Sequence, residues 1–304
     1  MKILHYALGF PPYRTGGLTK FCMDLMVQQK KEGHQAALLW PGKMSLIGSA
    51  SVSIKDRGNV DVDGCGIQSF EVINPLPISY DEGITAISAF TLDAGSTAYK
   101  NLLRTYKPDV IHIHTLMGLH SSFLDAAREM NIRTVFSAHD FFPICPKVTM
   151  YRHGAICSSA STCEECPQCN TTALSLDKIK LLQQPAYRTL KNSSLVKAMR
   201  KHHRDEYLSE SSEDPNATVD NTAADYKVLR SHYQSMLRKM DVIHYNSTVT
   251  EGVYKSSFTN LPPDRVISIT HSDIRDHRKK KSFPDDFLRI RYLGPQGGAK
   301  GFFY

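Results

Sequence analysis

The alternation of short apolar strands with amphipathic helices is the feature that most constrains the fold of this chain. A strand is predicted at residues 3–7, a helix at 19–31 and a second strand at 36–40. Two strands joined through a helix lie parallel in one sheet. The Pro- and Gly-rich loop at 9–17 is therefore predicted at the C-terminal edge of that sheet, where doubly wound proteins bind their ligands.

The same alternation continues along most of the chain. It predicts strands near 70–73 and at 109–114, 133–137, 242–245, 266–269 and 288–293, and helices at 98–106, 121–130 and up to residue 237. We therefore predict an α/β fold, with a Rossmann-like, doubly wound parallel sheet over residues 1–286. Two insertions interrupt it: a cysteine-rich one at 140–170 and a polar, flexible one at 207–225.

Composition narrows the class of partner. The 304 residues are 41% hydrophobic and 22% charged, which is ordinary for a soluble globular protein, and the formal net charge is +7. That excess favours anionic partners such as nucleotides, phosphates or anionic lipid. No nucleic-acid-binding module accompanies it, so no nucleic-acid partner is expected. Because there is no signal peptide and no apolar run of roughly 20 residues, we expect a cytoplasmic protein.

Two glycines, Gly16 and Gly17, stand directly before the first predicted helix. Glycine lets backbone N–H groups approach a ligand closely, and a helix N-terminus carries partial positive charge. Both features suit a diphosphate, although any tight turn between a strand and a helix can also require glycine. The loop alone leaves phosphate binding and a structural turn open.

Five of the seven cysteines lie between Cys145 and Cys169, including the CxxC pairs Cys163/Cys166 and Cys166/Cys169. In a reducing compartment such crowding is more typical of a metal site than of disulfides. Four thiolates at this spacing suit a tetrahedral, structural Zn²⁺. Inert thiols, a redox pair or an iron–sulfur cluster are the alternatives, and the spacing usual for the cluster is missing.

Four motifs in order resemble family 4 glycosyltransferases. They are Gly16-Gly17-Leu18, the PDVIHIH run at 108–114, the strand at 134–142 that ends in His139-Asp140, and the DVIHYNS run that ends at Ser247. The resemblance covers residues 1 to about 273 and implies the N-terminal, acceptor-side half of a GT-B fold. In that fold two Rossmann-like domains face each other across a cleft, and the nucleotide-sugar donor binds mainly to the C-terminal one.

The resemblance also implies a reaction and a set of residues. A sugar is transferred from a nucleotide-diphosphate donor to a saccharide or lipid-linked acceptor with retained anomeric configuration, and no catalytic metal is expected. The implied catalytic residues are His139 and, in an orienting role, Asp140; those for the donor phosphates are Gly16, Gly17 and Lys300; those lining the sugar cleft are His114 and Ser247. Many bacterial members have a similar cysteine insertion, which selects as zinc ligands Cys145, Cys157, Cys163 and Cys166.

His112 and His114 alternate with isoleucines and share one face of their predicted strand. We expect one of them to be a hydrogen-bonded interior histidine. His114 lies nearer to the end of the strand and is therefore the better ligand candidate.

One departure from the family pattern concerns the C-terminal residues. Lys300-Gly301 is present, but Pro295 stands where the family usually has an arginine. We expect 287–304 to begin a second, donor-binding domain and the transferase to be inactive without it. A non-catalytic glycan- or nucleotide-binding module is the alternative, and an epimerase is disfavoured because no acidic pair is evident.

The stretch at 176–204 is predicted to be helical and contains no acidic residue from Lys178 to Arg204. Leucines alternate with its basic residues, so it is partly amphipathic. Two interpretations remain: peripheral contact with an anionic membrane surface, or an ordinary solvated helix face. The second is favoured.

Overall fold

The computed structural model describes residues 1–46, 51–79, 83–152, 155–158, 160–191, 193, 194, 196, 198 and 220–270. The elements of the α/β core are, in chain order, β1 (Lys2–Tyr6), α1 (Gly17–Lys31), β2 (Gln35–Pro41), β3 (Ser53–Val62), β4 (Cys65–Ile73), α2 (Ile87–Phe90), α3 (Thr97–Tyr106), β5 (Val110–Ile113), α4 (Ser121–Glu129) and β6 (Arg133–Ala138). Those that follow are β7 (Tyr151–Arg152), β8 (Ala155–Ile156), α5 (Cys166–Cys169), α6 (Leu176–Leu182), α7 (Pro185–Leu190), α9 (Ala223–Leu237), β9 (Val242–Tyr245), α10 (Thr248–Ser257) and β10 (Asp264–Val266).

Eight strands form one sheet in the order β10-β9-β6-β5-β1-β2-β4-β3. Every neighbouring pair is parallel except β3 and β4, which pair antiparallel. From β1 the chain first builds toward β2 and later returns to add β5 on the other side of β1. The strand order therefore reverses between β1 and β5, which is the position where doubly wound sheets bind ligands. This topology confirms the predicted α/β fold class.

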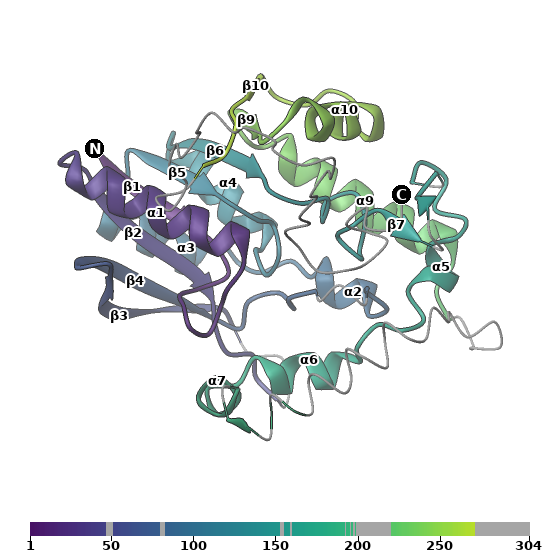
Figure 1. The fold of residues 1–304 in the computed structure, drawn as a ribbon, viewed down its shortest axis with the longest axis horizontal. Helices are drawn as coiled ribbons and strands as arrows, with labels where there is room; N and C mark the ends of the chain where they lie inside the picture. The colour runs from purple at the N-terminus through teal and green to yellow at the C-terminus, as the bar shows by residue number, and fades with distance from the viewer. Residues whose placement is uncertain are drawn as a thin grey trace, which may run out of the picture.

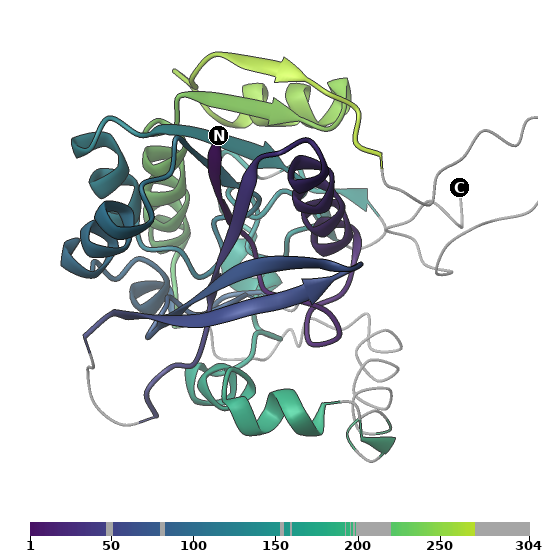
Figure 2. The same ribbon diagram turned by 90° about the vertical axis from the view of Figure 1, so that its left-hand side faces the viewer.

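Helices lie on both faces of the sheet (Figures 1 and 2), and the buried side chains form two separate hydrophobic clusters. On one face α1 packs through Cys22, Met23 and Met26 against β2 residues such as Leu38. On the other face α3, α4 and α9 pack against β1, β5 and β6, through side chains that include Tyr99, Phe123 and Tyr233. Side chains alternate between the two faces along each strand, so each of these central strands carries buried residues on both sides.

Three sequence-based expectations need correction. The strand β3 was not predicted, because its side chains are mostly exposed and polar and an edge strand shows no apolar run. The single helix expected at 176–204 begins as two short helices, α6 and α7, and Pro185 starts the second because proline cannot continue the first. The last described strand pairs through Asp264–Val266, two residues earlier than the predicted 266–269.

Several expectations fall outside the described residues. They concern Lys300, the 288–293 strand, the domain start at 287–304 and most of the 207–225 insertion. The boundary of the first domain at 286 likewise remains a prediction. In the part of the chain that the structure describes, no helix is both long and apolar enough to cross a membrane.

Candidate functional site

The C-terminal ends of β1, β5 and β6 meet beside the start of α1. The loop after β1 leads into α1, His114 follows β5 directly, and His139 follows β6. Phe21, one turn into α1, packs its ring 5.0 Å from the ring of His139 and 5.9 Å from that of His114, between centroids. The predicted glycine loop and both predicted histidines thus lie together at one sheet edge.

The glycine pair forms the N-terminus of α1. Gly16 is the N-cap residue, with φ 115° and ψ 172°, a backbone conformation that residues other than glycine rarely adopt. Gly17 is the first helical residue, and a Cβ placed on it would meet nothing within 4 Å. No described side chain caps this helix start. The first-turn N–H groups are thus available to a ligand, and the helix dipole favours an anionic one.

His139 and His114 are in direct contact. The Nδ1 atom of His114 lies 3.2 Å from Nε2 of His139, a hydrogen-bond distance. His114 is buried, with 1% of its surface exposed, whereas His139 is half-buried. Of the two, His139 is therefore the one that a ligand can reach. His114, predicted to line the sugar cleft, supports His139 from behind in this structure.

The two contacting histidines belong to a larger group on the face of the sheet that α1 covers. His5 in β1 and His112 in β5 are in register, and both are buried. His5 Nδ1 lies 3.0 Å from His114 Nε2, and His112 Nε2 lies 2.8 Å from the Ser137 hydroxyl. The histidine row is the name used here for His5, His112, His114 and His139. The strand pattern predicted one interior, hydrogen-bonded histidine in this strand, and the structure has two, because His112 and His114 are both buried and hydrogen-bonded.

Sequence reasoning missed His5 and the α1 residues Phe21 and Gln29. Gln29 Oε1 accepts a hydrogen bond at 2.8 Å from His5 Nε2. His5 occupies the same position relative to the end of β1 as His112 does in β5, and only the pairing of these two strands brings them together. A polar residue within an otherwise apolar central strand was the available signal.

Burial keeps the histidine row uncharged. It lowers the pKa of both His5 and His139 to about 4. The pKa of His112 and that of His114 lie well below the usual value, because burial and the neighbouring histidines both disfavour the charged form. At neutral pH these rings are therefore neutral, and each has one nitrogen that donates and one that accepts a hydrogen bond.

Asp140 and Ser247, also predicted for the site, accept hydrogen bonds from nearby backbone N–H groups. The Asp140 carboxylate accepts a hydrogen bond at 3.0 Å from the backbone N–H of Phe142. Burial raises the pKa of this carboxyl to about 6. Ser247 follows β9 as the N-cap of α10, where its hydroxyl accepts from the Thr250 N–H at 3.1 Å. Both contacts fit residues that fix loops and helix starts at the sheet edge.

The described residues of the cysteine segment, defined here as 140–170, form the paired strands β7 and β8 and the short α5, and little other regular structure. A hydrogen bond from Cys166 lowers the pKa of the Cys163 thiol to about 7, helped by the positive charges of Arg230 and Lys227. Burial raises the pKa of the Cys145 thiol, and hydrogen bonds from the backbone N–H groups of Met150 and Lys147 offset only part of this rise. Cys145, Cys157, Cys166 and Cys169 line one small cavity with Arg230. Several thiols and backbone donors therefore gather within the segment, with the Arg230 side chain of α9 beside them.

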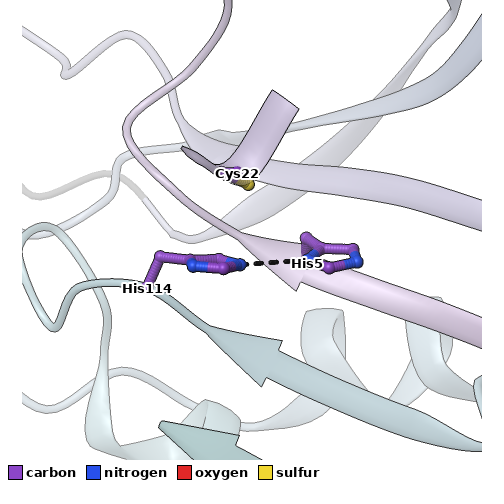
Figure 3. Close-up of side chains that lie close together, drawn as sticks. All are labelled: His5, Cys22 and His114. Carbon is purple, nitrogen blue, oxygen red and sulfur yellow. Dashed lines mark hydrogen bonds between the residues drawn. The ribbon is translucent and has the colours of Figure 1, made fainter. Parts of the chain in front are cut away.

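Among the described residues, three ligand atoms come close enough together to hold a metal ion beside the histidine row, and not among the cysteines of the segment. One ligand atom from each of His5, Cys22 and His114 lies within 4.8 Å of the other two, and all three residues are buried. Figure 3 shows the rings of His5 and His114 edge to edge, joined by their hydrogen bond, with the Cys22 sulfur beside them. Burial raises the pKa of the Cys22 thiol far above its usual value, so without a metal the sulfur stays protonated.

Comparison with proteins of known structure gives distant likenesses. Sucrose-phosphate synthase from Thermosynechococcus elongatus is 9% identical, with a TM-score of 0.39, over 88% of this chain and 47% of its own. The E. coli trehalose-6-phosphate structure with bound UDP-2-fluoro glucose is 13% identical, with a TM-score of 0.36, over 88% and 49%. The chain therefore spans about half the length of these two proteins.

The catalytic domain of starch synthase IV from Arabidopsis thaliana, bound to ADP and acarbose, is 12% identical, with a TM-score of 0.27, over 88% of this chain and 74% of its own. No curated protein matches the chain. The model of Glycosyltransferase Family 4 matches residues 15–161, a range that includes the glycine pair, His114, His139 and the predicted zinc ligands Cys145 and Cys157. Residues 15–161 are therefore a glycosyltransferase family 4 domain.

Proposed function

We propose that this domain serves in the retaining transfer of a sugar from a nucleotide-diphosphate donor to a saccharide or lipid-linked acceptor. The observation that carries the proposal is the juxtaposition, at the strand-order reversal, of the open α1 N-terminus with His139. The family match to residues 15–161 supports it. Catalysis on this proposal also needs the donor-binding second domain that the family resemblance implies.

The departing group in such a transfer is a nucleoside diphosphate. Free N–H groups at Gly17 and along the first turn of α1 can donate hydrogen bonds to its phosphate oxygens, and the helix dipole offsets the negative charge of these oxygens. Because Gly17 has open space where a side chain would lie, a phosphate can approach the backbone there. This stabilisation by backbone dipoles requires no bound divalent ion.

His139 is proposed to contact the sugar. With a pKa of about 4 the ring is neutral at physiological pH, so it acts through a hydrogen bond rather than a full charge. A neutral acceptor or donor placed beside the sugar helps to orient it and becomes more effective as charge develops on the anomeric carbon. Asp140 fixes the backbone that follows and is proposed as a positioning residue.

The test compares two variants in the complete enzyme. His139→Ala should lower kcat by on the order of 10²–10³ with little change in donor affinity, because the lost contact strengthens mainly in the transition state. Gly17→Val should weaken donor binding itself, because a branched side chain would fill the space beside the first-turn N–H groups. Steady-state kinetics and calorimetric donor affinity give both readouts. Wild-type turnover by His139→Ala would show that His139 is structural.

The cysteine segment is proposed to hold one structural Zn²⁺ through Cys145, Cys157, Cys163 and Cys166. The lowered pKa of Cys163 favours a thiolate at that position, whereas burial raises the pKa of Cys145 and the hydrogen bond to Cys163 raises that of Cys166, so a bound zinc ion would have to displace these two protons. Arg230 would offset part of the negative charge of such a site, and it also binds the Ile144 carbonyl at 2.9 Å, which ties α9 to the segment. The zinc would thus stabilise the loop that follows His139.

A further inference from the structure

An unbroken series of hydrogen bonds leads from the surface of α1 to His139. Gln29 Oε1 lies 2.8 Å from His5 Nε2, His5 Nδ1 lies 3.0 Å from His114 Nε2, and His114 Nδ1 lies 3.2 Å from His139 Nε2. Each ring uses both of its nitrogens, except His139. Among the described residues, no hydrogen bond engages Nδ1 of His139. The series therefore ends on the one ring nitrogen that remains for a ligand.

The Gln29 side chain sets which atom donates and which accepts in each of these hydrogen bonds. A neutral imidazole has a single N–H, so a ring that donates from one nitrogen must accept with the other. The carbonyl oxygen of Gln29 can only accept, which places the His5 proton on Nε2. His5 Nδ1 then accepts from His114 Nε2–H, and His114 Nδ1 accepts from His139 Nε2–H. His139 is left with an unprotonated Nδ1.

We infer that Gln29, His5 and His114 are positioning residues that fix the tautomer of His139, so that its Nδ1 meets the ligand as a hydrogen-bond acceptor. The matching ligand group is a hydroxyl donor, such as a sugar hydroxyl. Rotation of the Gln29 amide by half a turn would reverse every bond in the series and place a proton on Nδ1. The catalytic consequence rests on the proposed function; the tautomer itself does not.

Metal binding and this hydrogen-bond series exclude each other. An ion held by His5, Cys22 and His114 would take a nitrogen from each ring and displace the bond that joins them. Cys22 lies in the apolar cluster under α1 with Met23 and Met26. In the hydrogen-bonded arrangement it serves as a buried apolar residue. Addition of zinc to the purified chain is therefore a further test, because zinc binding at these three residues would break the hydrogen-bond series.

The decisive measurement is a long-range ¹H–¹⁵N spectrum of the chain with ¹⁵N-labelled histidine, which reports the protonated nitrogen of each ring. In the wild type we expect His5, His114 and His139 all to be protonated on Nε2. Gln29→Lys offers only donors and should move all three protons to Nδ1, whereas Gln29→Glu offers only acceptors and should leave them in place. Gln28→Lys is the matched control, because Gln28 is the exposed neighbour and bonds Glu32 instead.

Three results would overturn the inference. One is a wild-type spectrum with His139 protonated on Nδ1, which needs no variant to fold. Another is a His139 tautomer that does not respond to Gln29→Lys in a folded protein. The third is binding of one equivalent of Zn²⁺ that removes the N–H signals of His5 and His114.

Turnover then separates the inference from the proposed function. In the complete enzyme Gln29→Lys should lower kcat by on the order of 10², because His139 would present the wrong tautomer. Gln29→Glu should keep the wild-type kcat. If the tautomers respond as expected and kcat does not change, the positioning role stands and the catalytic role of His139 is wrong.

Discussion

The histidine row comes from three strands, with His5 in β1, His112 and His114 in β5 and directly after it, and His139 directly after β6, and more than a hundred residues separate His5 from the others. Five of the cysteines, in contrast, lie together between Cys145 and Cys169. The first group is positioned by strand pairing, which fixes His5 opposite His112 before any ligand binds. The second lies in a segment with two-residue strands and a four-residue helix. Strand pairing positions the residues of the histidine row. In the cysteine segment we propose that a bound metal positions them.

Metal removal should have the largest effect and should separate the two regions. A structural zinc site can contribute on the order of 10 kcal/mol of local binding and folding free energy. We therefore expect chelation, or Cys163→Ser, to expose the amides of 140–170 to hydrogen exchange while those of β1 and β5 stay protected. Elemental analysis should find close to one zinc per chain.

Cys65→Ser is the control for this experiment. Cys65 is a half-buried cysteine at the start of β4, outside the cysteine segment, and its replacement should leave both the zinc content and the exchange pattern unchanged. Anaerobically prepared protein without metal, whose thiols all react freely, would contradict the zinc proposal and remove the contrast between the regions.

Asp140, at the junction of the two regions, should give the next largest effect. Burial raises the pKa of its carboxyl from 3.8 to about 6, so the folded protein favours the protonated form. The stability from this group is fully present below pH 3.8 and is lost as the pH rises through 6, with a total of about 3 kcal/mol. Asp140→Asn cannot ionise and should lose none of it.

Denaturation of wild type and Asp140→Asn at a series of pH values checks this prediction. The variant should gain stability relative to the wild type as the pH rises from 4 to 7, and its amide oxygen can still accept the Phe142 N–H. Parallel pH profiles for the two proteins would show that the carboxyl is well solvated, and that the junction is less closely packed than the structure indicates.

A smaller effect should show that the sheet edge is formed without a ligand. Gly16 has φ 115°, so Gly16→Ala should cost about 1–3 kcal/mol of stability even in the absence of donor. Gly17 is the first residue of α1 and has open space around it, so Gly17→Ala should change stability by about 0.5 kcal/mol or less. Equal thermal midpoints for these two matched variants would mean that the loop adopts this conformation only when a ligand binds.

Much of the fold was predictable from the sequence, because the central strands are continuous apolar runs and the helices between them are periodic. The prediction failed at the periphery. The mostly polar strand β3 has no apolar run, and Pro185 divides the helical stretch that begins at Leu176. Local pattern carries little information where burial is low.

The candidate site was predictable only in part. His114 and His139 stand at strand ends, where a polar residue is conspicuous, and the structure brings them together. His5 and Gln29 reach them through strand order and through the packing of α1, which no local spacing reveals. The metal-ligand role of the cysteines and the catalytic role of His139 remain predictions.

The antiparallel strand β3 has a consequence for the solubility of the domain. It covers the outer edge of the apolar strand β4, whose unpaired backbone groups could otherwise recruit a strand from another molecule. β3 itself carries Lys55, Asp56 and Arg57 in succession, and its register shifts between Asp56 and Asn59. Consecutive charges and a bulge both discourage further pairing. At the β3 edge the sheet therefore ends in a polar, mostly exposed strand, which protects the domain from edge-to-edge aggregation.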